Sequence, residues 1–215
     1  MFVSTSIPLW TWIVPGSYLL GSIPFGLILG KVLGRRDVRA AGSGNIGAAN
    51  VARVAGAGAG VLTLLLDAAK GAFPVWLAAR ASGENAAMMM AAALAAIAGH
   101  CFPIWLKFRG GKGVATAAGA FLVLSPFAMG CAALLFILVV FLWRIVSLAS
   151  LAAAAAMPLL VYFLWAPHRA PPFIVSFGTL FAAVLIFAKH NGNLRRLWRG
   201  EEPRFAFGRK DRGGK

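Results

Sequence analysis

The stretch GSGNIGAANVAR, Gly42–Arg53, joins two long hydrophobic segments, and the rest of the chain is organised around it. It holds three glycines, and glycine adopts φ > 0 without steric cost, so the backbone can fold tightly around a ligand. Successive N–H groups in such a loop form a concavity that binds anions. Ser43 adds a hydroxyl, and Arg53 adds a planar guanidinium that suits phosphate. An ordinary turn between two helices has a similar composition, so this stretch alone leaves both interpretations open.

The segments on either side have the composition of an integral membrane protein. Hydrophobic residues make up 60% of the 215 residues, and the mean hydropathy is +0.80. Soluble domains are only about 45–50% apolar. The apolar blocks have the length of membrane helices, roughly 20 residues, and they lack the alternation of barrel strands. We therefore predict an all-α membrane protein.

Seven apolar segments are expected to be transmembrane helices. They cover residues 8–32, 55–79, 85–99, 114–124, 127–143, 147–165 and 172–188. The first contains Pro8, Pro15 and Pro24, so we expect it to be kinked or broken. The fourth is too short to cross a bilayer unless the loop before it dips inward, so the Gly-rich loops are predicted to be re-entrant.

Glycines in the first segment predict close helix packing, because Gly26, Gly30 and Gly34 recur every four residues. Two charges lie inside the second segment. Asp67 and Lys70 are one turn apart on one helix face, so we expect an ion pair, with a functional role as the alternative.

Positive charge is divided unequally between the two sides that seven spans create. One side receives five lysines and arginines from the first loop, three from the second, Arg144, and nine from Lys189 onward, eighteen in all. The other side receives Arg80 and Arg169. Because cytoplasmic loops carry the positive excess, the N-terminus is predicted outside and the C-terminus in the cytoplasm. The net charge of +15 follows this pattern, so no nucleic-acid partner is expected.

The chain is expected to form one domain over residues 1–207, with a disordered basic tail at 208–215. No cleaved signal peptide is expected, because no positive charge precedes the first apolar run. Cys101 adjoins a basic loop and Cys131 lies in a hydrophobic segment, so we expect no disulfide. No ligand spacing predicts a zinc site, and we expect neither metal nor cofactor.

Three polar stretches face the cytoplasm in this topology: Gly42–Arg53, the loop Arg109–Gly113, and Lys189–Glu201. Each supplies backbone N–H donors, a cation, and a hydroxyl or an amide, which are the groups that bind phosphate. His190 and Asn193 are three residues apart, so they share a face if the helix continues. Together the stretches predict an anion site on the cytoplasmic face.

Known nucleotide and hydrolase motifs do not fit these stretches. A P-loop needs glycine where Leu106 stands, and Ser or Thr where Gly113 stands. The nucleophile elbow needs glycine where Ala41 stands. Only six acidic residues are present, so paired-carboxylate chemistry is not expected.

Several long motifs in order resemble one family, the bacterial integral-membrane acyl-phosphate:glycerol-3-phosphate acyltransferases. They are LLGSIPFG (Leu19–Gly26), DVRAAGSGNIGAANVAR (Asp37–Arg53), LDAAKG (Leu66–Gly71), GHCFPIWLKFRGGKGVAT (Gly99–Thr116), SLAS (Ser147–Ser150) and KHNGNLRRLWRGEE (Lys189–Glu202). The resemblance covers nearly the whole chain. One departure is Ala49, where the family more often has threonine.

The resemblance implies a reaction, the first acylation of phospholipid biosynthesis. A fatty acyl group passes from acyl phosphate to the 1-hydroxyl of sn-glycerol 3-phosphate, giving lysophosphatidate and phosphate. Relatives that use acyl thioesters carry H-x-x-x-x-D. Here Trp105, Phe173 and Arg195 stand five residues after the three histidines, so that motif is absent.

The resemblance also implies roles for individual residues. The catalytic set is Ser43, Lys112, His190 and Asn193, and the substrate-binding set adds Asn45, Arg53, Gly110, Gly111 and Ser150. Asn45 and the glycine amides are the candidates for the acyl phosphate and its oxyanion. Ser147 is an alternative to Ser150. Lys112 and Arg53 would also fit as positive-inside residues, and His190 would fit as a helix cap. His100 is assigned a structural role.

The expected setting is the bacterial inner membrane, with the active site facing the cytoplasm. The expected partners are glycerol 3-phosphate, long-chain acyl phosphate and membrane lipid, and the protein is expected to be a monomer coupled to an acyl-phosphate-producing enzyme. A transporter of an anionic metabolite is the alternative, but it should show two matching halves, and no internal repeat is visible. A scaffold without chemistry would not need Ser, Lys, His and Asn on one side.

Overall fold

Helices form all the regular structure of residues 10–165 and 173–204, the parts of the chain that the computed structural model describes. In chain order they are α1 (Trp10–Gly21), α2 (Phe25–Val32), α3 (Ala48–Ala55), α4 (Ala57–Ser82), α5 (Ala86–Cys101), the 3₁₀ helix η1 (Ile104–Leu106), α6 (Val114–Leu124), α7 (Pro126–Trp143), α8 (Val146–Trp165), α9 (Phe173–Lys189) and α10 (Asn191–Trp198). The predicted all-α class is confirmed.

Local sequence explains where several helices begin and end. The predicted break in the first segment is confirmed, because α1 ends at Gly21 and α2 begins directly after Pro24. Asn85 caps α5, since its side chain accepts hydrogen bonds from the N–H groups of Ala87 and Met88. Pro126 opens α7, where the missing N–H costs nothing.

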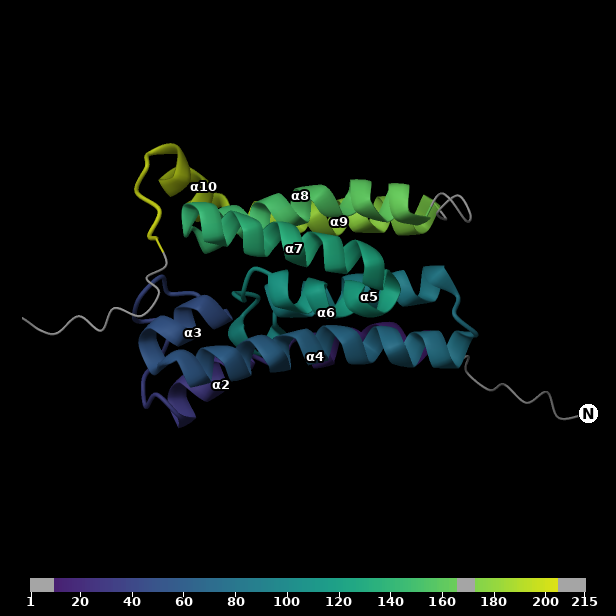
Figure 1. Ribbon diagram of the computed structural model, residues 1–215. Helices are drawn as coiled ribbons and strands as arrows, with labels where there is room; N and C mark the ends of the chain where they lie inside the picture. Colours follow the sequence, from purple (N-terminus) through teal and green to yellow (C-terminus); the bar gives the residue numbers. More distant parts are fainter. Residues whose placement is uncertain (1–9, 166–172, 205–215) are drawn as a thin grey trace, which may run out of the picture.

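The helices pack side by side in two groups (Figure 1). α7, α8 and α9 lie together above α4, α5 and α6, while α2 and α3 extend from one end of α4. Small residues bring α4 and α6 into contact: a Cβ on Gly119 would lie 1.9 Å from the Ala68 carbonyl oxygen. Lipid tails are as apolar as leucine, so helices in a membrane associate through such close packing.

The glycines in and just after α2 pack closely, as the four-residue spacing predicted. A Cβ on Gly26 would meet the carbonyl oxygen of Ile46, and a Cβ on Gly34 would meet Ala55 at the end of α3. α2 is therefore held against the first polar stretch. This contact fixes the stretch relative to the bundle.

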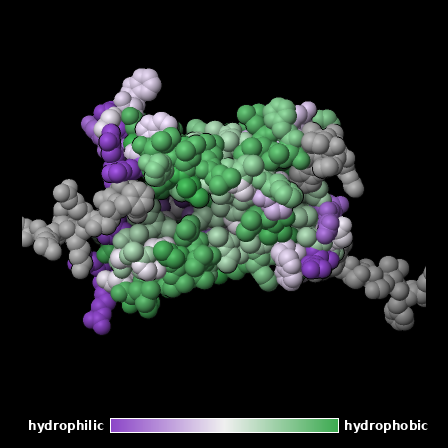
Figure 2. Space-filling view, in the orientation of Figure 1, coloured by the Kyte–Doolittle hydropathy of each residue, from purple (hydrophilic) through white to green (hydrophobic). Residues whose placement is uncertain are grey.

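Five helical segments of the described chain are long and apolar enough to cross a membrane, or six if α9 and α10 form one bent span. The first of them runs from Thr11 to Val32 and includes both α1 and α2. α6 has 11 residues, which is short of the roughly 20 that a bilayer requires. In Figure 2, hydrophobic side chains cover the middle, and hydrophilic ones lie at both ends, with the larger group at the end that carries α3 and α10. The tail predicted to be disordered, 208–215, lies outside the described residues.

Candidate active site

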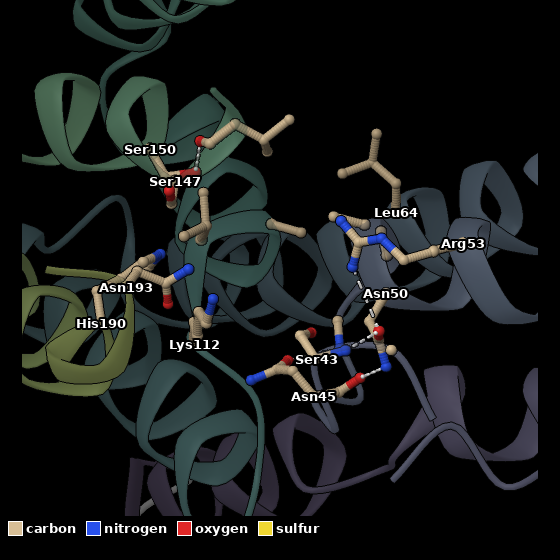
Figure 3. A pocket seen from close by; sticks show the side chains of 18 of the residues that line it. Ser43, Asn45, Asn50, Arg53, Leu64, Lys112, Ser147, Ser150, His190 and Asn193 are labelled. Carbon is tan, nitrogen blue, oxygen red and sulfur yellow. Dashed lines mark hydrogen bonds between the residues drawn. The ribbon is translucent and has the colours of Figure 1, made fainter. Parts of the chain in front are cut away.

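A cavity of about 500 Å³ opens among the three polar stretches at the hydrophilic end of the bundle (Figure 3). Seven of the residues predicted for the site line it: Ser43, Asn45, Arg53, Lys112, Ser150, His190 and Asn193. Ser43 and Asn45 come from the loop before α3, and Arg53 comes from α3 itself. Lys112 comes from the loop before α6, Ser150 from α8, His190 from the break between α9 and α10, and Asn193 from α10. The packing of the bundle therefore brings together groups that are far apart in sequence.

Asn50 organises the first polar stretch, although sequence reasoning gave it no role. Its side chain is buried; Oδ1 accepts a hydrogen bond from Ser43 N at 2.7 Å, and Nδ2 donates to Val38 O and Asn45 O, both at 2.8 Å. Gly42 has φ of +61°, and a Cβ there would lie 2.2 Å from Asn50 Oδ1. Glycine is thus required for conformation and for space. The folded stretch holds Ser43 and Asn45 at the cavity.

The glycine loop before α6 is arranged differently from the expectation. Gly110 N donates to Cys101 O at 3.2 Å and Gly111 N donates to His100 O at 3.0 Å. These two amides therefore satisfy carbonyls at the end of α5 that have no partner within the helix. Both glycines lie behind the cavity wall, packed against His100, and this loop lines the cavity through Lys112 and Gly113.

Lys112 brings a positive charge into the partly buried cavity. Burial lowers the pKa of its ammonium to about 8; the Glu202 carboxylate opposes that shift, and Arg196 and Arg53 add to it. The ammonium therefore stays mostly protonated at neutral pH. A cation that is partly removed from water attracts an anionic ligand strongly, because its field is less screened.

His190 lies where the chain bends by 64° between α9 and α10. The helix does not continue through this point, yet His190 and Asn193 both line the cavity. His190 Nδ1 lies 2.8 Å from Ile186 O, so Nδ1 carries the proton and caps the end of α9. Burial lowers the pKa of the imidazole to about 4, so the ring is neutral at pH 7. Nε2 is then left with a free lone pair, which accepts hydrogen bonds.

Glu202 is an anchor of the site that sequence reasoning missed. Its Oε1 accepts hydrogen bonds from Asn193 Nδ2 at 2.5 Å and Ser147 Oγ at 2.7 Å, and its Oε2 accepts one from Arg196 Nε at 2.7 Å. Desolvation opposes ionisation, but these hydrogen bonds hold the pKa of the carboxyl below its ordinary value. Arg196 belongs to the third polar stretch but was not assigned to the predicted site, although it lies three residues beyond Asn193 on one helix face.

The two alternative serines of α8 both line the cavity but bond differently. Ser150 Oγ donates to Val146 O within its own helix at 2.9 Å, whereas Ser147 Oγ reaches Glu202. Leu64, Phe136 and Val146 supply an apolar side of the same cavity. The cavity therefore has a polar wall and an apolar wall. Within the described residues, no three His, Cys, Asp or Glu side chains come together as metal ligands would.

Comparison with known proteins identifies similar chains. Residues 11–200 match the family described as glycerol-3-phosphate acyltransferase. A glycerol-3-phosphate acyltransferase of Syntrophotalea carbinolica is 50% identical over 88% of this chain and 94% of that protein. Two crystal structures of PlsY (YgiH), an integral membrane glycerol 3-phosphate acyltransferase, are also similar. Its glycerol 3-phosphate form has a TM-score of 0.85 and 38% identity, covering 92% of this chain and 96% of that one. Its lysophosphatidic acid form has a TM-score of 0.82 and 36% identity, covering 92% and 95%.

Proposed function

Because the chain belongs to the glycerol-3-phosphate acyltransferase family, we propose that its cavity transfers a fatty acyl group from acyl phosphate to the 1-hydroxyl of glycerol 3-phosphate. The products are lysophosphatidate and inorganic phosphate. The acyltransferase activity toward glycerol 3-phosphate follows from the family. The acyl-phosphate donor is the finer part of the proposal, and it rests on the sequence motifs and on the two walls of the cavity.

The observation that carries the proposal is the meeting of a polar and an apolar wall in one cavity. Lys112 and Arg53 supply positive charge for the phosphates of the two substrates. Leu64 and Phe136 supply apolar surface for an acyl chain that enters from the membrane. An acyl phosphate has both kinds of group next to each other, at the reacting carbonyl.

Roles in the reaction follow from the hydrogen bonds that are already made. Asn45 Oδ1 accepts from Gly47 N at 2.8 Å, so its Nδ2 is the part of the amide that can donate to the acyl phosphate or its oxyanion. Asn193 is held by Glu202 and anchors glycerol 3-phosphate together with Lys112. Ser43 acts as a hydrogen-bonding residue and forms no covalent intermediate.

Proton transfer is assigned to the substrate itself. The 1-hydroxyl oxygen attacks the acyl carbonyl carbon, the bond from that carbon to the phosphate oxygen breaks, and inorganic phosphate leaves. The hydroxyl proton passes to the phosphate of glycerol 3-phosphate, whose second pKa is about 6, and from there to the leaving phosphate, which departs as hydrogen phosphate. His190 is a weaker base, with a pKa of about 4, so we assign its Nε2 to accepting a hydrogen bond from a substrate hydroxyl.

The proposed setting is a single domain over residues 1–207 that crosses the bacterial inner membrane seven times. The N-terminus lies outside and the cavity faces the cytoplasm, where the positive-inside pattern puts the basic loops. α6 counts as the short fourth crossing, completed by the inward glycine loop. The protein works as a monomer and receives its donor from an acyl-phosphate-producing enzyme.

Assay of the purified protein tests the donor. With palmitoyl phosphate and glycerol 3-phosphate, we expect release of inorganic phosphate and formation of lysophosphatidate in equal amounts, without acyl-CoA or acyl carrier protein. A reaction without protein, and one without glycerol 3-phosphate, are the matched controls for phosphate released by hydrolysis of the donor. Equal or greater turnover with palmitoyl-CoA would overturn the proposed donor.

A further inference from the structure

A buried ion pair lies beneath the cavity. Lys70 Nζ is 2.9 Å from Asp67 Oδ1, and both side chains are only 2% exposed. The ammonium also donates a hydrogen bond at 2.7 Å to Ile23 O, in the break between α1 and α2. The sequence-based prediction of an ion pair is thus confirmed. The pair links α4 to the broken first span.

His100 continues this chain of polar groups toward the glycine loop. Its side chain is buried at the end of α5, and Nδ1 lies 3.7 Å from Asp67 Oδ1. On the other side of the ring, a Cβ added to Gly111 would lie only 2.0 Å from Nε2. The imidazole therefore fills the space between the Asp67 carboxylate and the backbone that precedes Lys112.

Two polar atoms in this series of polar groups are incompletely paired. Asp67 Oδ1 has the Lys70 ammonium at 2.9 Å and His100 Nδ1 at 3.7 Å, but among the described residues neither Asp67 Oδ1 nor His100 Nδ1 has a partner with hydrogen-bond geometry. Such atoms are costly to bury, because each loses its water. Asp67 and His100 also line the cavity, so the chain reaches the site from below.

We propose that Asp67 and His100 are positioning residues, which act through the glycine loop to hold Lys112 where it meets the substrate phosphate. Lys70 connects them to the α1–α2 break, whose continuation in α2 packs against the first polar stretch. The chain Lys70–Asp67–His100 thus sets two phosphate-binding stretches relative to each other. The inference rests on the proposed role of Lys112.

A double-mutant cycle between His100 and Lys112 tests the inference. His100→Gln, Lys112→Ala and the double variant are assayed for kcat/KM with glycerol 3-phosphate, using only protein that elutes as a folded species. Misplacement of a binding group by a mutation lowers the rate on the order of 100-fold. We therefore expect His100→Gln to lower kcat/KM about 10- to 100-fold when Lys112 is present. In protein that already carries Lys112→Ala, the His100→Gln change should lower kcat/KM by less than about threefold, because the ammonium that His100 positions is absent.

Two further variants keep the test decisive. Gly111→Ala adds a methyl group that must displace the His100 ring, so it disturbs the same contact from the loop side. It should show the same coupling to Lys112, and it provides the test if His100→Gln does not fold. Thr179→Val removes a buried hydroxyl that bonds Val175 O in α9, away from the cavity, and should leave the kcat/KM of either background unchanged.

The outcomes separate this inference from the proposed function. The positioning role would be overturned if His100→Gln lowered kcat/KM by the same factor with and without Lys112. Full activity of both His100→Gln and Gly111→Ala would also overturn it. Full activity of Lys112→Ala alone would instead overturn the assignment of Lys112, and with it the proposed site.

Discussion

Ser147 Oγ donates a hydrogen bond to Glu202 Oε1 at 2.7 Å, across 55 residues of sequence. The Glu202 side chain is only 7% exposed, although the residue follows the last helix of the described chain. This bond ties the chain after α10 to the start of α8. It completes the polar wall of the cavity, because the same carboxylate oxygen holds Asn193.

Ser147→Ala should destabilise the protein more than Ser150→Ala. The first change removes a hydrogen bond to a charged group, worth about 1.5–3 kcal/mol. The second removes a bond from Ser150 to the i−4 carbonyl of its own helix, which adds little or nothing to helix stability. Thermal unfolding in detergent measures the difference. Equal losses for the two variants would show that the Glu202 contact contributes little.

Lys112→Ala should lower kcat/KM for glycerol 3-phosphate by roughly ten- to a hundredfold. The change removes a charge-assisted contact worth about 1.5–3 kcal/mol in a partly dehydrated cavity. Arg109→Ala is the matched control, because it removes an exposed positive charge from the same loop outside the cavity lining. Similar losses in both variants would indicate a general effect of loop charge.

Activity should fall as pH rises through about 8. In the proposed role Lys112 binds phosphate as the protonated ammonium, and its pKa of about 8 means that the charge is lost above that pH. The measurement is kcat/KM against pH, which reports the free enzyme. Lys112→Arg keeps its charge throughout, so its profile should lack the fall near pH 8. Persistence of that fall in Lys112→Arg would assign it to another group.

His190→Asn should retain a measurable fraction of activity and mainly raise the KM for glycerol 3-phosphate. Asparagine keeps a polar group at this position, and the proposed mechanism needs no proton transfer to His190. Steady-state kinetics with varied glycerol 3-phosphate measure the effect. A normal KM with a kcat lowered by several orders of magnitude would make His190 the base. A trapped acyl-Ser43 would replace direct transfer by a covalent route.

Impermeant thiol labelling of intact cells should leave the three polar stretches unmodified. Single cysteines are placed at Asn45, Arg109 and Arg195 in a variant whose native cysteines are alanine. Ala81→Cys, exposed at the other end of α4, is the positive control and should react. Strong labelling at position 109 from outside would contradict the proposed orientation.

Much of the fold could be predicted because the signals are local. Hydrophobic runs predict helices wherever they occur, and the break before α2 follows directly from Pro24. The Asp67–Lys70 pair follows from helical spacing alone. The number of crossings was harder to predict, since α6 is short and its depth depends on the loop beside it.

The candidate site was predicted in its chemistry and only partly in its geometry. Residue type together with the family resemblance predicts that Ser43, Lys112 and His190 bind phosphate and hydroxyls. Residue type does not reveal that the Gly110 and Gly111 amides are used by carbonyls of α5. Those bonds depend on where α5 ends relative to the loop.

The sequence by itself determined the helical membrane class, the unequal distribution of basic residues and the supply of cations, hydroxyls and amides in three polar stretches. These properties follow from hydropathy, charge and residue chemistry, which each segment carries alone. Only the tertiary structure decided that Asn50 orders the first stretch, that His190 caps α9 through Nδ1, and that Glu202 joins α8 to α10. The Asn50 and His190 bonds are local in sequence, but they need the backbone turn at Gly42 and the bend between α9 and α10. The Ser147–Glu202 bond needs α8 to lie beside the chain that follows α10, and no single segment contains that information.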